Sequence, residues 1–188
     1  MLVSRSKQLQ PIDWAMAALR AIAAEGVDAL SVERLAASIG VTKGSFYWHF
    51  ADRPALVAAA TELWEEVGTK QVIEQLEALP DPVLRLRRLF ELTFGDELMG
   101  PTDTALASEA DDPVIGAIVR RVTATRVAYV ESVFVELGFA PVAAAHRARL
   151  VYAAYLGHFS LVSAMPNDRF FGVGRARYLR DVLDALTS

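Results

Sequence analysis

The chain has 188 residues, of which 53% are hydrophobic, and a formal net charge of −4 at pH 7. It contains no cysteine, which excludes disulfides and thiolate metal sites and is typical of proteins in a reducing cytoplasm. No apolar run is long enough to cross a membrane, and the first ten residues lack the apolar core of a secretory signal. We therefore expect a cytoplasmic protein that does not bind to or span a membrane.

The first helix is expected between Pro11 and Gly26. Proline is favoured at the first position of a helix, and Asp13 places a negative charge in the first turn, where the helix dipole favours it. Gly26 can adopt the left-handed conformation that ends many helices. The apolar residues between these signals recur at helical spacing: Ala15, Ala18, Leu19 and Ile22. Since helical spacing recurs in later segments and no strand pattern is present, the predicted fold class is all-α.

Two short helices joined by a tight turn are predicted within Ser31–Phe50, SVERLAASIGVTKGSFYWHF. Ser31 is a favourable N-cap for the first helix, and Thr42 occupies the same position before the second. Gly40 can supply the positive φ that lets the chain reverse between them. The apolar residues of the first helix share one face: Val32, Leu35, Ala36 and Ile39. Two capped helices with so short a connection are typical of a helix-turn-helix unit.

The second of these helices, predicted over residues 43–50, has more large aromatic residues than one face can bury. Phe46 and Phe50, four residues apart, mark the buried face, which is the usual place for aromatic residues at helical spacing. Tyr47 and Trp48 lie roughly opposite, and exposing both side chains calls for a binding partner. The open N–H groups at the start of this helix favour phosphate. A helix with such an outward face fits the major groove of double-stranded DNA.

The run KGSFYWHF, followed by ADRPAL, resembles the signature of the TetR (tetracycline-repressor-like) family of transcriptional regulators. The resemblance covers Gln8 to about Gly68, and the later chain only in its pattern of helices. It implies a three-helix DNA-binding domain at residues 8–56, with its helix-turn-helix motif at 31–50, and a larger helical effector-binding and dimerisation domain at residues 57–188. Carried over to this sequence, the motif implies phosphate contacts for Ser31, Thr42, Tyr47, His49 and Arg53. It implies positions near base edges for Lys43, Gly44, Ser45 and Trp48.

Two residues of this segment depart from the family pattern. Arg53 stands where the family usually has lysine, which keeps the charge. Glu33 could accept a hydrogen bond from a cytosine amino group, or it could favour the N-terminus of its own helix, which is the commoner role. Residues 1–56 hold six basic and five acidic side chains, a net charge of +1, so that the rest of the chain carries −5. This small excess predicts few phosphate contacts in each subunit and weak non-specific binding.

Proline and glycine divide the remaining chain into further helices. Asp52 is expected to cap a long fourth helix, which Gly68 weakens and bends. Pro80 and Pro82 break the chain after it. Beyond this break we expect a helix at 83–94, a loop over 95–104, a short helix at 104–110, and long helices at 115–137, 141–165 and 174–186.

The last two predicted helices indicate a homodimer. Four apolar residues near the end of the chain would leave exposed apolar surface unless another element covers it: Tyr178, Leu179, Val182 and Leu183. In the TetR family the corresponding helices pair with their copies in a second subunit as a four-helix bundle. Such a dimer would present two recognition helices about 34–36 Å apart, one turn of B-DNA, and would read a palindrome-like operator.

The second domain is expected to bind a small-molecule effector between its helices, in a cavity lined mostly by apolar and aromatic residues. The candidates for its lining are Trp64, Phe90, Phe94, Phe134, Tyr155 and His158. Each of these residues could equally be an ordinary core residue. For the histidine, which lies in the middle of an apolar helix, a hydrogen-bonded place in the core is the commoner outcome.

The sequence contains no catalytic motif, no metal-ligand spacing among its three histidines and no glycine-rich phosphate loop, so we expect no catalytic residue, metal site or cofactor. A helical enzyme would have to use Glu62, Glu66 or His158, which form no recognisable constellation. The predicted function is that of a dimeric transcriptional repressor, which a small-molecule effector releases from a palindromic operator. The alternative is a ligand-sequestering or partner-binding helical protein with a vestigial DNA-binding unit, which the small local charge and Glu33 favour.

Overall fold

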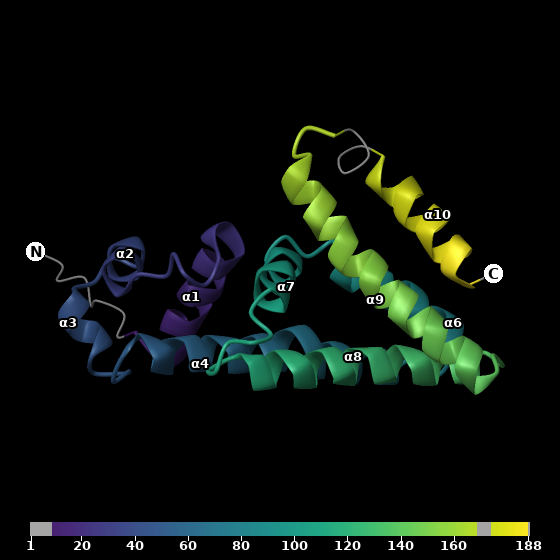
Figure 1. Ribbon diagram of the computed structural model, residues 1–188, viewed down its shortest axis with the longest axis horizontal. Helices are drawn as coiled ribbons and strands as arrows, with labels where there is room; N and C mark the ends of the chain where they lie inside the picture. Colours follow the sequence, from purple (N-terminus) through teal and green to yellow (C-terminus); the bar gives the residue numbers. More distant parts are fainter. Residues whose placement is uncertain (1–8, 169–173, 188) are drawn as a thin grey trace, which may run out of the picture.

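A computed structural model of the chain describes residues 9–168 and 174–187, and within these ranges the protein is built from helices and turns without any strand. The all-α prediction is therefore confirmed. Figure 1 shows α1 (Pro11–Glu25), α2 (Val32–Ser38) and α3 (Lys43–Phe46) together at one end of the molecule. Helix α4 (Arg53–Glu65) leads from this end toward the remaining helices.

The three N-terminal helices and α4 enclose a first hydrophobic core. Trp14, Leu19 and Phe46 are fully buried in it. The rings of Trp14 on α1 and Phe46 on α3 meet edge to face with centroids 5.4 Å apart, an arrangement that adds specificity to the burial of both rings. The short helix α3 is therefore fixed in position by an aromatic contact with α1.

The ends of these helices follow the capping signals of the sequence. The Ser31 side chain accepts a hydrogen bond from the backbone of Arg34, and the Asp52 side chain accepts one from Ala55. Gly26 and Gly40 have φ angles of 82° and 73°, the left-handed region that favours glycine. Thr42 occupies the N-cap position of α3, but its side chain makes no capping hydrogen bond.

Helix α3 is shorter than predicted. It ends at Phe46 instead of Phe50, because the backbone N–H groups of His49 and Phe50 both bond to the carbonyl oxygen of Phe46 in a tight terminal turn. This turn keeps the rings of Phe46 and Phe50 stacked, with centroids 5.6 Å apart. Tyr47 and Trp48 are left on the outside of the turn.

The bend expected at Gly68 is a local change of helix type. Helix α4 continues without a break into a π-helical segment, η1 (Glu66–Lys70), and then into α5 (Gln71–Glu77). A π-helical turn widens the helix and turns backbone carbonyl groups away from their usual partners, which is why such turns occur often at functional sites. Here the carbonyl oxygen of Gly68 accepts a hydrogen bond from Arg126.

A second hydrophobic core lies between the later helices, α6 (Pro82–Thr93), α8 (Gly116–Glu136), α9 (Pro141–Ala164) and α10 (Arg175–Thr187). Helices α8 and α9 form an antiparallel pair, as expected for long helices joined by a short turn, and Gly138 with φ 91° makes that turn. Figure 1 shows α10 lying along α9. The predicted bounds of all four helices are correct to within one or two residues.

The bounds of α7 were also predicted wrongly. A loop was expected over 95–104 and a short helix at 104–110, whereas α7 spans Met99–Ala107. Gly100 and Pro101 are compatible with the first turn of a helix, and the Asp96 side chain accepts hydrogen bonds from the backbone of Leu98 and Met99. Helix α7 packs against both α1 and α9, and Met99 and Leu106 belong to the first core. The first core therefore extends beyond residue 57.

Candidate functional site

The outward face of α3 and its terminal turn exposes two large aromatic side chains. Trp48 is 87% exposed and Tyr47 is 58% exposed. The Tyr47 ring meets the buried ring of Phe46 edge to face, with centroids 5.2 Å apart, so the core holds its base while its outer edge faces solvent. Thr42, Lys43 and Gly44 are also exposed on this segment. The expected exposure of the Tyr47 and Trp48 pair is confirmed.

Glu33 on α2 joins two of the predicted DNA contacts. Its carboxylate forms an ion pair with Lys43 Nζ at 2.5 Å and accepts a hydrogen bond from the Ser31 hydroxyl at 3.1 Å. The hydrogen bond from Lys43 lowers the pKa of Glu33 to about 2, with smaller contributions from the backbone and from Ser31. The same ion pair raises the pKa of Lys43. The Glu33 carboxylate is thus charged at neutral pH and neutralises the only lysine of α3.

Three other predicted contacts are half-buried. Arg53 Nε donates to the carbonyl oxygen of Leu30 at 2.9 Å, and its Nη2 donates to that of Val27 at 2.5 Å. Through these hydrogen bonds the guanidinium links the start of α4 to the segment between α1 and α2. Ser45 Oγ is shielded from solvent and has no hydrogen-bond partner within the described residues. His49 is half-buried at the end of the turn.

A narrow cavity lies in the C-terminal part of the molecule, between η1, α5, α6, α8 and α9. Its volume is about 80 Å³. The lining is mostly apolar and aromatic, which is typical of small-molecule sites. Three of the six predicted lining residues are present in it: Phe90, Phe94 and Tyr155.

The other three predicted lining residues belong to the core around the cavity. Phe134 is fully buried among the residues of the second core. His158 is buried beside Phe94 and stacks on Tyr178 of α10, with ring centroids 5.6 Å apart. Burial lowers the pKa of this histidine, and the charge of Arg175 lowers it further. Trp64 is buried in the first core, and its indole N–H donates to Asp103.

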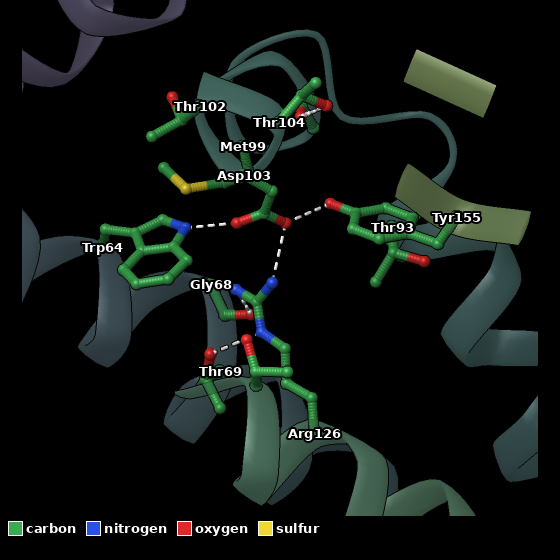
Figure 2. Close-up of polar contacts among 12 residues, drawn as sticks. Trp64, Gly68, Thr69, Thr93, Met99, Thr102, Asp103, Thr104, Arg126 and Tyr155 are labelled. Carbon is green, nitrogen blue, oxygen red and sulfur yellow. Dashed lines mark hydrogen bonds and ion pairs between the residues drawn. The ribbon is translucent and has the colours of Figure 1, made fainter. Parts of the chain in front are cut away.

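A buried polar cluster lies at the inner side of the cavity (Figure 2). Asp103 on α7 is 2% exposed, and its carboxylate accepts hydrogen bonds from Trp64 Nε1, from the Tyr155 hydroxyl and from Arg126 Nη1, the last at 2.7 Å. Arg126 Nε also donates to the Thr69 hydroxyl at 2.8 Å. The cluster therefore connects α4, η1, α7, α8 and α9 through charge-assisted hydrogen bonds.

Comparison with known proteins identifies the N-terminal helices. Residues 16–60 match the family model of bacterial regulatory proteins of the tetR family. A segment of 73 residues is 36% identical to the HTH-type transcriptional regulator AcrR of Shigella flexneri. Residues 16–60 therefore carry the DNA-binding domain of the TetR family. The AcrR match covers 38% of this chain and 34% of AcrR, about a third of the length of that protein.

Solved structures of TetR proteins share the fold over nearly the whole chain. A TetR regulator from Legionella pneumophila has a TM-score of 0.78 at 17% identity and covers 98% of each chain. One from Agrobacterium tumefaciens has a TM-score of 0.78 at 18% identity, with 95% of this chain and 97% of that chain covered. FadR of Bacillus subtilis, solved in complex with stearoyl-CoA, has a TM-score of 0.69 at 13% identity, with 95% and 98% covered. The fold shared with these structures thus includes the C-terminal helices.

Sequence reasoning missed the most polar part of this protein's interior. Asp103 fell in the predicted loop at 95–104 and Arg126 in the predicted long helix at 115–137, and neither was considered as a site residue. The partners of Asp103 lie 23 to 52 residues away along the chain, so no local pattern connects them. The available signal was an arginine within the apolar stripe of a long helix, because a charged side chain in such a stripe needs a partner.

Within residues 9–168 and 174–187 no helix is long and apolar enough to cross a membrane. The same ranges contain no group of three or more histidine and acidic side chains placed to hold a metal ion.

Proposed function

We propose that this protein is a sequence-specific DNA-binding transcriptional repressor. The observation that carries the proposal is the exposure of Trp48 and Tyr47 on the recognition helix of a helix-turn-helix unit, together with the match of residues 16–60 to the TetR family model. The aromatic edges and Gly44 would approach the base pairs, while Thr42 and the N-terminal N–H groups of α3 would contact phosphates.

The DNA-binding form is proposed to be a homodimer that reads a palindrome-like operator. Helix α9 supports this, because several of its apolar side chains lie in solvent: Val142, Leu150 and Leu161 are 69%, 57% and 48% exposed, and Met165, directly after the helix, is 44% exposed. Exposed apolar side chains along a long helix favour association with a second copy. The four apolar residues of α10 that motivated the dimer prediction are instead half-buried against their own chain. The proposed interface is therefore formed mainly by α9.

The effector is proposed to bind in the cavity between η1, α5, α6, α8 and α9. The apolar lining supports an amphiphilic ligand, and FadR of Bacillus subtilis, which has the same fold, was solved with stearoyl-CoA. An effector would weaken DNA binding by having higher affinity for a subunit arrangement whose recognition helices do not match the half-site spacing.

Selection of duplex DNA from a random pool at low salt tests the proposal. We expect an enriched palindromic sequence, which the protein binds as a dimer. Trp48→Ala should lose this binding while its circular dichroism and unfolding midpoint stay unchanged. Failure to enrich any sequence would overturn the proposal and favour the ligand-sequestering alternative, which the Glu33–Lys43 ion pair also supports.

A further inference from the structure

We propose that Arg126 is the anchor for an acidic effector, and that a slender ligand with one carboxylate releases α7 by competing with Asp103 for this guanidinium. The inference rests on the proposed function, because it assigns the ligand class and the regulation of the same cavity. It makes Arg126 the specificity-determining residue and Asp103 the residue that transmits binding to the DNA-binding helices.

The charge of the cavity wall indicates an acidic ligand. Among the described residues that line the cavity, Arg126 is the only basic one and Asp96 the only acidic one. The Asp96 carboxylate already accepts hydrogen bonds from two backbone N–H groups at the start of α7. Burial opposes the charge on Arg126, but Asp103 outweighs it and the pKa of Arg126 is raised, so the guanidinium stays charged. A ligand carboxylate would find its favourable partner at this end of the cavity.

The size of the cavity indicates a short ligand. A cavity of about 80 Å³ suits a ligand with only a few non-hydrogen atoms, since even one water molecule occupies at least about 10–15 Å³. Hexanoate has a similar number of non-hydrogen atoms, and its alkyl chain matches the apolar part of the lining, which includes Ile73, Leu89 and Val130. A bulky ring system would not fit without movement of the surrounding helices.

The position of Asp103 connects this cavity to the DNA-binding domain. Its three donors come from α4, α8 and α9, and two of them, Arg126 and Tyr155, also line the cavity. Figure 2 shows the carboxylate between these side chains. Helix α7, which carries Asp103, packs against α1 on one side and α9 on the other. A displacement of Asp103 would therefore move α7, which is in direct contact with α1.

Competition between the ligand carboxylate and Asp103 for Arg126 couples ligand binding to the position of α7. A ligand carboxylate on Arg126 would lie close to Asp103, and two like charges in a poorly solvated site repel each other. Asp103, which is buried and already accepts three hydrogen bonds, can relieve this repulsion by moving away with α7. The arrangement with α7 displaced then binds the ligand better, which is the differential affinity that allostery requires.

Titration calorimetry with hexanoate and with hexan-1-ol tests the ligand class in the absence of DNA. We expect hexanoate to bind about tenfold more tightly than the neutral alcohol, as a charge-assisted hydrogen bond would allow. In the double variant Asp103→Asn/Arg126→Gln, which removes both charges together and avoids a lone buried charge, this preference should disappear. Equal affinities in the unchanged protein, or a preference that survives in the double variant, would overturn the proposal.

Arg121→Gln is a matched control for the double variant. Arg121 lies on the same helix, α8, and forms an ion pair with Glu65 of α4 at 2.6 Å, but it does not line this cavity. We expect this variant to keep the full preference for hexanoate. A loss of preference equal to that of the double variant would show a general effect of charge on α8 and would overturn the role of Arg126.

The coupling is tested by fluorescence anisotropy on a duplex selected as the operator. In the unchanged protein hexanoate should weaken DNA binding, whereas Asp103→Asn should bind hexanoate about tenfold more tightly and lose the effect on DNA. Unchanged release of DNA from Asp103→Asn would overturn the transmission through Asp103 while leaving the repressor function intact. Absence of any operator would contradict the proposed function, and the calorimetric result would still decide the ligand class.

Discussion

For Trp48, folding favours burial of the side chain, whereas the proposed DNA contact requires its exposure. Burial of a tryptophan side chain would stabilise the protein by about 4 to 6 kcal/mol, on the basis of about 25 cal/mol per Å² over roughly 150–250 Å². The neighbouring Phe46 and Trp14 are completely buried, whereas Trp48 is 87% exposed. The terminal turn of α3 directs its side chain away from this core, and contact with DNA would recover the stabilisation.

Trp48→Ala is expected to reduce operator affinity by about five- to 150-fold, since a base contact contributes roughly 1–3 kcal/mol. Its free energy of unfolding should change by less than about 0.5 kcal/mol, because the side chain has little to lose in the folded protein. Anisotropy titrations and urea unfolding measure the two quantities. Val135→Ala, which removes an exposed apolar side chain of α8, should leave both unchanged. A large stability loss in Trp48→Ala with intact DNA affinity would contradict this assignment.

Glu33 is predicted to limit non-specific DNA binding. Its pKa of about 2 keeps the carboxylate charged and paired with Lys43 at the pH of any DNA-binding experiment. Glu33→Gln should free Lys43 for a phosphate, raise the affinity for random-sequence DNA, and steepen the dependence of log K on log salt by about one unit per subunit. The affinity measured over a series of salt concentrations checks this. An identical slope in both proteins would mean that Lys43 makes no phosphate contact.

At the scale of secondary-structure elements, local signals predicted most of the helices. Ser31 and Asp52 cap α2 and α4, and Gly26 ends α1, because these interactions join residues only a few positions apart. The bounds of α7 were predicted wrongly, since its apolar residues are few and its stability depends on α1 and α9. For the same reason the bonds of Asp103 could not be predicted: they join four helices that only the complete fold brings together.

Because α7 and α9 approach each other closely, substitution of Gly100 is predicted to destabilise the protein. A Cβ atom at this position would lie 2.1 Å from Cζ of Phe159, whose buried ring has little room to move. Gly100→Ala should lower the free energy of unfolding by about 1–3 kcal/mol, and Phe159→Leu in the same chain should recover part of the loss. Urea unfolding of the single and double variants measures this coupling. Additive effects of the two substitutions would exclude the contact.

The packing of α10 on α9 is predicted to weaken in mild acid. His158 stacks on Tyr178, and its pKa is lowered by burial and by Arg175, so the unfolded chain binds a proton at a higher pH than the folded protein does. Stability should therefore be unaffected above the usual pKa of histidine, about 6.5, and fall as the pH decreases below it. Urea midpoints between about pH 7.5 and about pH 5.5 should show this decline. His158→Phe should have a flatter profile, and an equally steep profile would place the titrating group elsewhere.

At the scale of the whole molecule, the charge distribution is predicted to make DNA binding dependent on dimer formation. Residues 1–56 carry a net charge of +1 and the rest of the chain −5, so a single subunit offers DNA little electrostatic attraction. Two recognition helices on one site would double the base contacts and place the acidic domains away from the duplex. Specific binding should therefore be lost whenever the subunits separate.

Leu150→Glu tests this dependence. Leu150 lies on the exposed face of α9 at 57% exposure, so a charge there costs the isolated subunit little but would be buried without a partner in the proposed interface. Analytical ultracentrifugation should show a monomer whose helical content and thermal midpoint remain close to those of the unchanged chain. This monomer should bind operator DNA at least about a hundredfold more weakly, because it loses one of its two half-site contacts.

Substitution of Gly157 on α9 tests the proposed α9 interface independently. A Cβ atom at this position meets nothing within 4 Å in the single chain, and alanine is preferred to glycine inside a helix by about 0.5–1 kcal/mol. Gly157→Ala should therefore stabilise the Leu150→Glu monomer. In the proposed dimer the added methyl group should weaken association if α9 approaches its copy closely at this position. Stabilisation of monomer and dimer alike would place Gly157 outside the interface and move the subunit contact toward Leu161 and Met165.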